Sequence, residues 1–186
     1  MKKIILASGS PRRKQLLEWA EVEFDVIVSD ADESFPADIS FVDAATHIAL
    51  NKALAVQNKV KNISCILAAD TIVVCNNKVI GKPTDRQDAI NILTELSGNT
   101  HEVITGVAIL SNAEKILFAD TTKVTFHPLT QGQIEFYVDN YKPYDKAGAY
   151  AIQEWIGVVG IKRVEGCFYN VMGLPVSRVV QHLQKL

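Results

Sequence analysis

The segment Ser8-Gly9-Ser10-Pro11-Arg12-Arg13 places two adjacent arginines directly after a turn of small residues. Arginine is well suited to bidentate binding of phosphate oxygens. Two positive charges in the first turn of a helix oppose the helix dipole, so we expect an anion nearby to compensate them. The alternative is a basic first turn that is simply solvated, because short motifs also occur by chance. The segment therefore favours phosphate binding.

Lys52 and Asp70 fall where the hydrophobic pattern predicts a buried environment. Lys52 lies in the centre of the apolar stripe of a helix that Ser40 is expected to cap and that runs to about Lys59. A lysine there is either a stem that reaches water at the edge of the core or a phosphate ligand at the base of a cleft. Asp70 follows a continuous apolar run, so its carboxylate must lie at the mouth of a strand or be paired. A paired structural aspartate is the alternative to a ligand-binding one.

An acidic loop and a third lysine complete the candidate residues. Asp30, Asp32 and Glu33 form a carboxylate cluster that suits Mg²⁺ or Mn²⁺, although a solvated loop explains it equally well. Lys82, in Gly81-Lys82-Pro83, is by itself an ordinary turn lysine. Together with the arginines, Lys52 and Asp70, these residues are those needed to bind a nucleoside polyphosphate with a divalent metal. The sequence has no Walker motif and no nucleophile elbow, which excludes a P-loop NTPase and a serine hydrolase of that type.

The elements that must position these residues alternate along the chain. A short strand over residues 4–7 precedes a helix with Ser10 at its N-cap and Pro11 at its first position. Further strands are expected over 65–74 and 78–80, and Thr84 is expected to cap the next helix. Later elements are two strands over 102–110 and 116–126, a helix from Thr130 to about Tyr137 and a terminal helix after Leu174-Pro175. This alternation predicts the α/β class with a mixed sheet.

Composition sets limits on the function. The chain has 186 residues, a net charge of −2, 48% hydrophobic and 22% charged residues, which is typical of one soluble domain with a substantial core. The charge argues against a general nucleic-acid or membrane partner, so any anion site must be local. No apolar run approaches a membrane span, and the N-terminus lacks a signal-peptide pattern, so we expect a cytoplasmic protein. Its 3 cysteines and 4 scattered histidines predict neither disulfides nor a transition-metal site.

In their order along the chain, these motifs resemble those of the Maf family of nucleoside triphosphate pyrophosphatases. The resemblance covers essentially the whole chain, so a single Maf-like domain over residues 1–186 is expected. It implies an elongated mixed β-sheet with flanking helices and two lobes around a cleft, as in inosine triphosphate pyrophosphatases. Beyond the segments already quoted, it rests on Asn51-Lys52-Ala53, Ala69-Asp70-Thr71, Leu96-Ser97-Gly98 with His101, Thr105-Gly106-Val107, the segment from Asp145 to Gln153, and Gly173-Leu174-Pro175.

The resemblance also implies roles for individual residues. Asp70 matches the general base, or proton acceptor, and Glu33 the metal-linked carboxylate. The sequence leaves open whether Asp70 acts as the base, holds the metal, or both. The phosphate-binding positions are Ser8, Arg13, Lys52 and Lys82, of which the two lysines are assigned to catalysis, and the positions linked to substrate choice are Arg12, Thr71 and Gln153.

The segment Asp145-Lys146-Ala147-Gly148-Ala149-Tyr150-Ala151-Ile152-Gln153 is similar to that of the dTTP/UTP branch. One departure is Glu154-Trp155, where relatives often have glycine after the glutamine. The expected reaction is metal-assisted attack of water on the α-phosphorus of dTTP or UTP, with a role in removing modified nucleotides. The alternative is a non-catalytic regulator of cell division that binds nucleotide or nucleic acid and has no need of Asp70. A homodimer is left open as an assembly.

Overall fold

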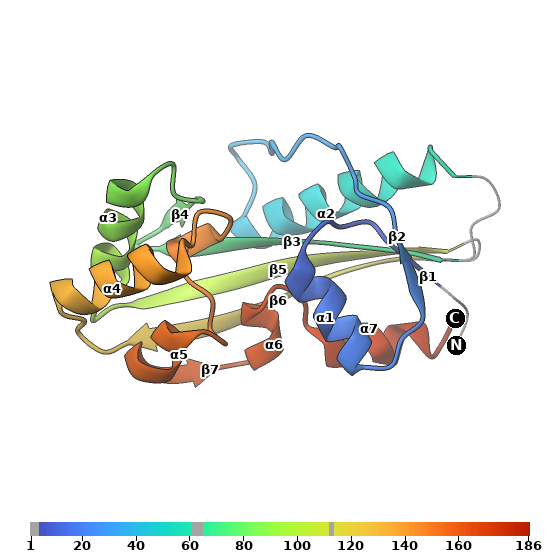
Figure 1. Ribbon diagram of the computed structural model, residues 1–186. Coiled ribbons are helices and arrows are strands. Elements are labelled where there is room, and N and C mark those ends of the chain that lie inside the picture. Colours follow the sequence, from blue (N-terminus) through green and yellow to red (C-terminus); the bar gives the residue numbers. More distant parts are fainter. Residues whose placement is uncertain (1–3, 61–64, 112–113) are drawn as a thin grey trace. The chain divides into compact units, whose positions relative to one another are not determined.

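The computed structural model of the chain describes residues 4–60, 65–111 and 114–186 (Figure 1). Strands and helices alternate over most of this length, which confirms the expected α/β class. In chain order, the elements are β1 (Ile4–Leu6), α1 (Pro11–Trp19), β2 (Phe24–Val26), α2 (Phe41–Gln57), β3 (Cys65–Cys75), β4 (Lys78–Ile80), α3 (Arg86–Leu96), β5 (Thr100–Ser111), β6 (Lys115–Phe126), α4 (Gln131–Tyr141), the 3₁₀ helix η1 (Ala147–Ala149), α5 (Trp155–Gly160), β7 (Ile161–Glu165), α6 (Phe168–Val171) and α7 (Val176–Leu183).

The described strands form one 7-stranded sheet in the order β2-β1-β3-β5-β6-β7, with β4 paired to β3. β1 is parallel to β2 and β3, whereas β4 is antiparallel to β3 and β7 is antiparallel to β6, so the sheet is mixed as predicted. β1 pairs with only the start of β3. Leu6 is the partner of Leu67, and the Ala7 N–H donates to the Leu67 carbonyl at 2.8 Å. The rest of β3 extends beyond the carboxyl end of β1.

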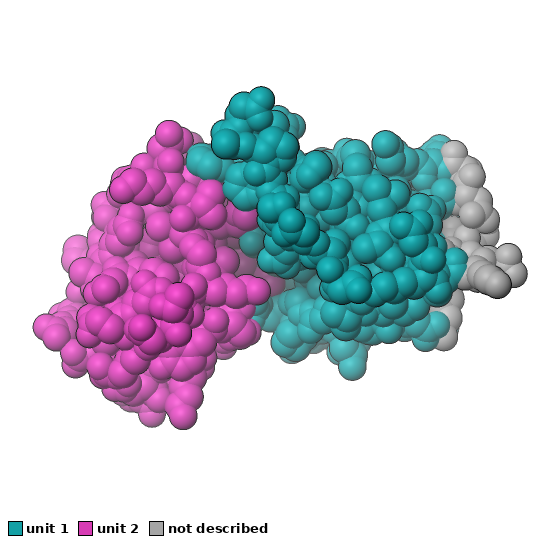
Figure 2. Space-filling view, turned by 90° about the horizontal axis from the view of Figure 1, so that it is seen from above, with its two compact units in different colours: residues 1–71, 104–120, 173–186 teal, residues 72–103, 121–172 magenta. Residues whose placement is uncertain are grey.

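The chain divides into two compact units (Figure 2). Unit 1 comprises residues 1–71, 104–120 and 173–186, and unit 2 comprises residues 72–103 and 121–172. β3, β5 and β6 each contribute residues to both units.

In unit 1, α1 and α2 lie on opposite faces of the sheet (Figure 1). α2 begins as predicted, because the Ser40 hydroxyl accepts a hydrogen bond from the Asp43 N–H at 3.1 Å. The buried Ala49 and Ala53 are four residues apart on the inner face of α2, in one core cluster with Ile66 and Ala108. Since alanine is small, the α2 backbone can approach the sheet closely, and this brings Lys52 to β3.

In unit 2, α3 begins one residue later than the sequence suggested. Asp85 is its N-cap, because the Asp85 carboxylate accepts a hydrogen bond from the Asp88 N–H at 2.9 Å. The Thr84 N–H instead donates to the Asp88 carboxylate at 2.9 Å, so the prediction that Thr84 is the cap was wrong. α4 begins after Thr130 as predicted and continues past Tyr137 to Tyr141.

Candidate active site

Asp70 lies in the middle of β3, with five residues of the strand on either side. Asp70 is therefore not at the mouth of its own strand. The strand that ends near Asp70 is its neighbour β1. The pairing of β1 with β3 ends at Leu67, and Asp70 lies beyond it. Ligands of open α/β sheets bind outside the carboxyl ends of such strands. Asp70 thus lies on a part of β3 whose edge is not covered by β1.

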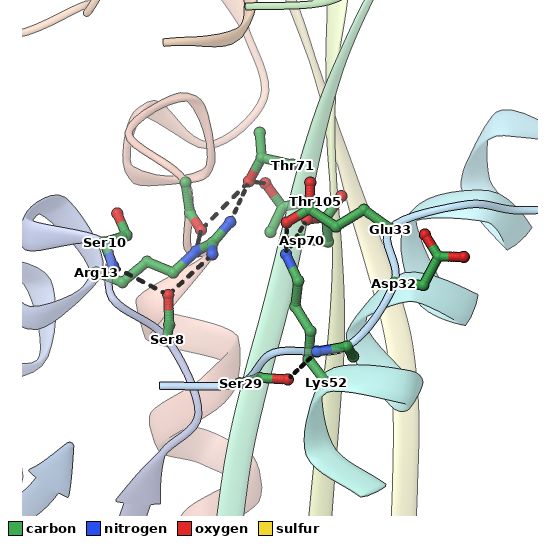
Figure 3. Close-up of polar contacts among 12 residues, drawn as sticks. Ser8, Ser10, Arg13, Ser29, Asp32, Glu33, Lys52, Asp70, Thr71 and Thr105 are labelled. Atoms are coloured by element: carbon green, nitrogen blue, oxygen red, sulfur yellow. Dashed lines mark hydrogen bonds and ion pairs between the residues drawn. The ribbon is translucent and has the colours of Figure 1, made fainter. Parts of the chain in front are cut away.

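Lys52 is the partner of Asp70 (Figure 3). Its Nζ lies 2.7 Å from Asp70 Oδ1 and 2.6 Å from Glu33 Oε1. The Lys52 and Asp70 side chains are each only 12% exposed, whereas that of Glu33 is 58% exposed. A buried ammonium and a buried carboxylate each carry a large desolvation cost unless they are paired. The structure thus corrects the idea of a lysine stem that reaches water at the edge of the core, and it shows that Asp70 is paired in the folded chain.

The three carboxylates of the acidic loop separate in the folded chain. Asp30 binds Lys59 Nζ at 2.8 Å, and this hydrogen bond is the main reason that the Asp30 pKa is lowered. Asp32 accepts hydrogen bonds from the Ser34 hydroxyl and N–H, which lower its pKa as well. Glu33 alone reaches the Lys52–Asp70 pair. Among the described residues, no group of three or more histidine, cysteine or acidic side chains could hold a metal ion. Any shared cation would therefore depend on two carboxylates, Asp70 and Glu33.

Arg13 is buried, with 8% of its surface exposed, and does not form the solvated basic turn considered above. Its Nε donates to the Gly173 carbonyl at 2.8 Å, one terminal nitrogen to Ser8 Oγ at 3.1 Å, and the other to Thr71 Oγ1 at 3.0 Å. Burial lowers the pKa of the Arg13 guanidinium, and the charge of Asp70 opposes that shift. Because the three acceptors are neutral, Arg13 keeps its positive charge available to an anion.

β3 carries a residue of both groups of contacts, Asp70 for Lys52 and Thr71 for Arg13. Asp70 and Thr71 are consecutive strand residues, so their side chains point to opposite faces of the sheet. Lys52 reaches Asp70 from α2 on one face, and Arg13 reaches Thr71 from α1 on the other. The Thr71 hydroxyl also lies 2.9 Å from that of Thr105 on β5. Thr105 and the Gly173 carbonyl were not predicted as site residues, although both belong to the motifs quoted above.

The model of the family described as Maf-like protein matches residues 3–186 of this chain. The chain belongs to the Maf family. This confirms the resemblance inferred from the sequence motifs, and the match extends from the N-terminal strand to the terminal helix.

Proteins similar to this Maf chain along nearly their whole length carry the name dTTP/UTP pyrophosphatase. One from Cytophaga hutchinsonii is 48% identical over 183 residues, which covers 98% of this chain and 84% of that protein. One from Flavobacterium johnsoniae is 44% identical and covers 99% of this chain and 95% of that protein. One from Bacillus mycoides is 45% identical and covers 100% of this chain and 96% of that protein.

Two solved structures show a more distant likeness to this Maf chain. One is the structure of the Staphylococcus aureus Ham1 protein. The match covers 67% of this chain and 72% of the Ham1 chain, with 14% identity and a TM-score of 0.45. The other is the crystal structure of protein VC0702 from Vibrio cholerae. The match covers 76% of this chain and 77% of the VC0702 chain, with 11% identity and a TM-score of 0.38.

The remaining Maf motif positions occupy different surroundings. Arg12 is half-buried in the first turn of α1, within unit 1. Lys82 and Gln153 belong to unit 2, and both are exposed. Within that unit, the Gly148 N–H donates to the Gly81 carbonyl at 3.1 Å, so the segment that ends in Gln153 is tied to the turn that carries Lys82. The structure therefore places six of the nine predicted residues in two polar networks of unit 1: Glu33, Lys52 and Asp70 form one, and Ser8, Arg13 and Thr71 form the other. Among the described residues, no helix has the length and apolar character that crossing a membrane requires.

Gly106 of the Maf Thr-Gly-Val motif sets how closely α2 approaches β5. A Cβ at this position would lie 2.2 Å from the Ala45 carbonyl carbon and 2.3 Å from the Thr46 nitrogen. These are backbone atoms of α2, so the whole helix would have to move, and Lys52 with it. We expect Gly106→Ala to lower the free energy of unfolding by about 3 kcal/mol, measured by urea denaturation.

Gly132→Ala is the matched control, because an added Cβ there meets nothing within 4 Å. Gly132 lies in the first turn of α4, where alanine is expected to stabilise by up to about 1 kcal/mol. Equal unfolding curves for wild type and Gly106→Ala would show that the contact between α2 and β5 is looser than the structure indicates.

Proposed function

We propose that this chain is a nucleoside triphosphate pyrophosphatase that hydrolyses dTTP and UTP to the monophosphate and pyrophosphate. The observation that carries the proposal is the convergence of Asp70, Lys52 and Glu33 beyond the carboxyl end of β1. The loop that follows β1 carries Ser8 and leads to Arg13, whose charge suits a phosphate chain. The family and the names of the relatives support the same activity.

Asp70 is the proposed proton acceptor. It takes a proton from a water molecule whose oxygen forms a bond to the α-phosphorus, while the bond from that phosphorus to the bridging oxygen of pyrophosphate breaks. Lys52 is bound to Asp70, so it holds this carboxylate in a fixed orientation. Lys52, Lys82, Arg13 and Ser8 stabilise the charge of the phosphate chain and of the departing pyrophosphate. Positioning and electrostatics supply most of the catalysis in phosphoryl transfer.

The carboxylates fit a divalent metal of the Mg²⁺ or Mn²⁺ type. Mg²⁺ in phosphate-transfer sites is usually held by one or two carboxylates together with oxygens of the substrate. Asp70 and Glu33 are two such carboxylates, and both lie within 2.7 Å of one cation, the Lys52 ammonium. They would hold the metal, with substrate oxygens as further ligands. When bound, the metal would neutralise phosphate charge and lower the pKa of a water molecule.

Arg12, Thr71 and Gln153 are proposed to choose the base. The amide of Gln153 has both a donor and an acceptor, and uracil and thymine present carbonyl oxygens and a ring N–H. One amide can therefore pair with both kinds of group on a pyrimidine. A site built in this way rejects other bases, because they leave polar groups without partners.

The experiment that tests the function is a kcat/KM panel over the common NTPs and dNTPs and 7-methyl-GTP, with pyrophosphate release as the readout. We expect dTTP and UTP to be cleaved at least about tenfold more efficiently than ATP and GTP. Gln153→Ala is expected to reduce this preference while pyrophosphate is still released. A preference for a purine triphosphate would overturn the assigned substrates, and the absence of pyrophosphate release with every nucleotide would overturn the enzyme itself.

The relatives give no support to the alternative of a non-catalytic regulator, since those named above bear an enzyme's name. The family match over residues 3–186 supports one Maf-like domain over residues 1–186. The cytoplasm stays the predicted compartment, and a homodimer stays a prediction that a sedimentation measurement can test.

A further inference from the structure

Gln153 lies in a tight turn of unit 2 whose two ends bind the same buried hydroxyl group. The turn is formed by residues 151–154, and the Glu154 N–H donates to the Ala151 carbonyl at 3.1 Å. Tyr137 of α4, which is fully buried, accepts a hydrogen bond from the Ala151 N–H at 3.2 Å. The same Tyr137 hydroxyl donates to Oε2 of Glu154. One side chain thus fixes the residues on both sides of Ile152 and Gln153.

The carboxylate of Glu154 connects this turn to the beginning of the same segment. Its Oε1 lies 3.7 Å from Lys146 Nζ, and Lys146 also binds Asp145 at 2.8 Å. Lys146 is a lysine with only 8% of its surface exposed, so its ammonium depends on these carboxylates. Each carboxylate oxygen of Glu154 therefore has a partner, Tyr137 for Oε2 and Lys146 for Oε1. These two contacts account for a glutamate directly after Gln153.

The backbone of the turn also has little room to move. A Cβ on Gly157 would lie 1.8 Å from the Ile152 carbonyl oxygen, so α5 packs directly against the turn. The side chain of Gln153 is nevertheless exposed. This combination, a rigid backbone with a polar side chain held outward, is what recognition of a ligand by a single amide requires.

We propose that Tyr137 is a positioning residue for substrate choice, whose hydroxyl holds the 151–154 turn in the conformation that presents Gln153 to the pyrimidine base. The proposal rests on the proposed role of Gln153. Tyr137 itself touches no substrate and acts through the backbone of the turn. If the role of Tyr137 were purely structural, loss of its hydroxyl group would instead lower kcat/KM equally for all substrates.

The test compares Tyr137→Phe with wild type, and uses Tyr141→Phe as the matched control. Phenylalanine keeps the buried ring and removes only the hydroxyl group. Tyr141 lies one turn further along α4, is 39% exposed and stacks on Tyr137, so the control removes a hydroxyl from the neighbouring ring. We expect Tyr137→Phe to reduce the ratio of kcat/KM for UTP to that for CTP by about fivefold, the effect of one net hydrogen bond. Tyr141→Phe is expected to leave this ratio unchanged.

Two further measurements separate positioning from a general loss of stability. Hydrogen exchange of the Ala151 and Glu154 amides is expected to accelerate in Tyr137→Phe, because both amides belong to the held turn. In the Gln153→Ala background, Tyr137→Phe is expected to have no further effect on the UTP to CTP ratio, since the side chain that it positions is gone. Glu154→Ala is a second variant that removes the acceptor of the Tyr137 hydroxyl, and it is expected to reduce the ratio in the same direction.

The outcomes distinguish this proposal from the proposed function. If Gln153→Ala changes the ratio while Tyr137→Phe and Glu154→Ala do not, Tyr137 is not a positioning residue and the role of Gln153 stands. If Tyr137→Phe lowers kcat/KM equally for all nucleotides, its role is structural and the proposal is overturned. If Gln153→Ala leaves the ratio unchanged, the role of Gln153 fails and the positioning role fails with it, while pyrophosphate release still defines the enzyme.

Discussion

Asp70→Asn is expected to lose turnover by about 10²–10⁴-fold, the contribution of a general base, while the protein stays folded. The amide has the size of the carboxylate but cannot accept the proton of water or carry its charge. Lys52 keeps Glu33 as a carboxylate partner at 2.6 Å, so its ammonium is not left without a counter-charge. The measurement is steady-state pyrophosphate release from dTTP, with thermal unfolding of the same preparation.

Asp139→Asn is a suitable control for that experiment, because it removes a carboxylate that is also paired with a cation. Asp139 binds Arg86 at 2.6 Å in an exposed ion pair, where the loss of charge is expected to matter little. Near wild-type kcat in Asp70→Asn would show that Asp70 has the structural role of a counter-ion to Lys52. A loss of kcat in both variants would indicate a general effect of charge.

Removal of divalent metal is expected to stop the reaction completely. We expect excess EDTA to abolish pyrophosphate release, and Mg²⁺ or Mn²⁺ to restore it. Glu33→Gln should raise the metal concentration needed for half-maximal rate by at least about tenfold, because it removes one of two carboxylate ligands. Binding of Mn²⁺ alone, followed by its electron paramagnetic resonance signal, gives the same comparison without turnover.

Asp32→Asn is the matched control for Glu33→Gln. It removes a charge from the adjacent residue, but that carboxylate binds Ser34 and does not reach Lys52. Its metal requirement is expected to equal that of the wild type. Full activity of the dialysed protein in excess chelator would refute the metal-assisted mechanism, and equal shifts in both variants would show that Glu33 acts only through the charge of the loop.

Local sequence patterns were sufficient to predict the elements that carry Arg13, Lys52 and Asp70. The apolar run before Ser8 and the Pro11 that follows Ser10 predicted β1 and the start of α1, and the capping residue Ser40 predicted α2. Such signals lie within a few residues of the structure that they specify, since caps and hydrophobic periodicity act over one or two helical turns. The failure at Thr84 has the same origin, because two neighbouring residues could cap α3 and only the backbone geometry selects Asp85.

Only the tertiary structure decided which charged groups meet. The sequence placed Lys52 on the inner face of a helix and Asp70 in an apolar run, but the contact between them depends on α2 packing across β3. Likewise, the charge and local pattern of the acidic loop did not distinguish Glu33, which joins that pair, from Asp30 and Asp32, which do not; only the family resemblance singled out Glu33.

Arg13 gives the clearest physical reason for this division. Its Nε binds the carbonyl of Gly173, which is 160 positions away in the chain. Helix and strand patterns report burial and periodicity near a residue, but strand order and helix packing bring distant segments together. The sequence alone therefore determined elements such as β1, α2 and β3, the residue types and the family resemblance. The paired state of Asp70, the burial of Arg13 and the hold of Tyr137 on the Gln153 turn followed from contacts between segments that are distant in sequence.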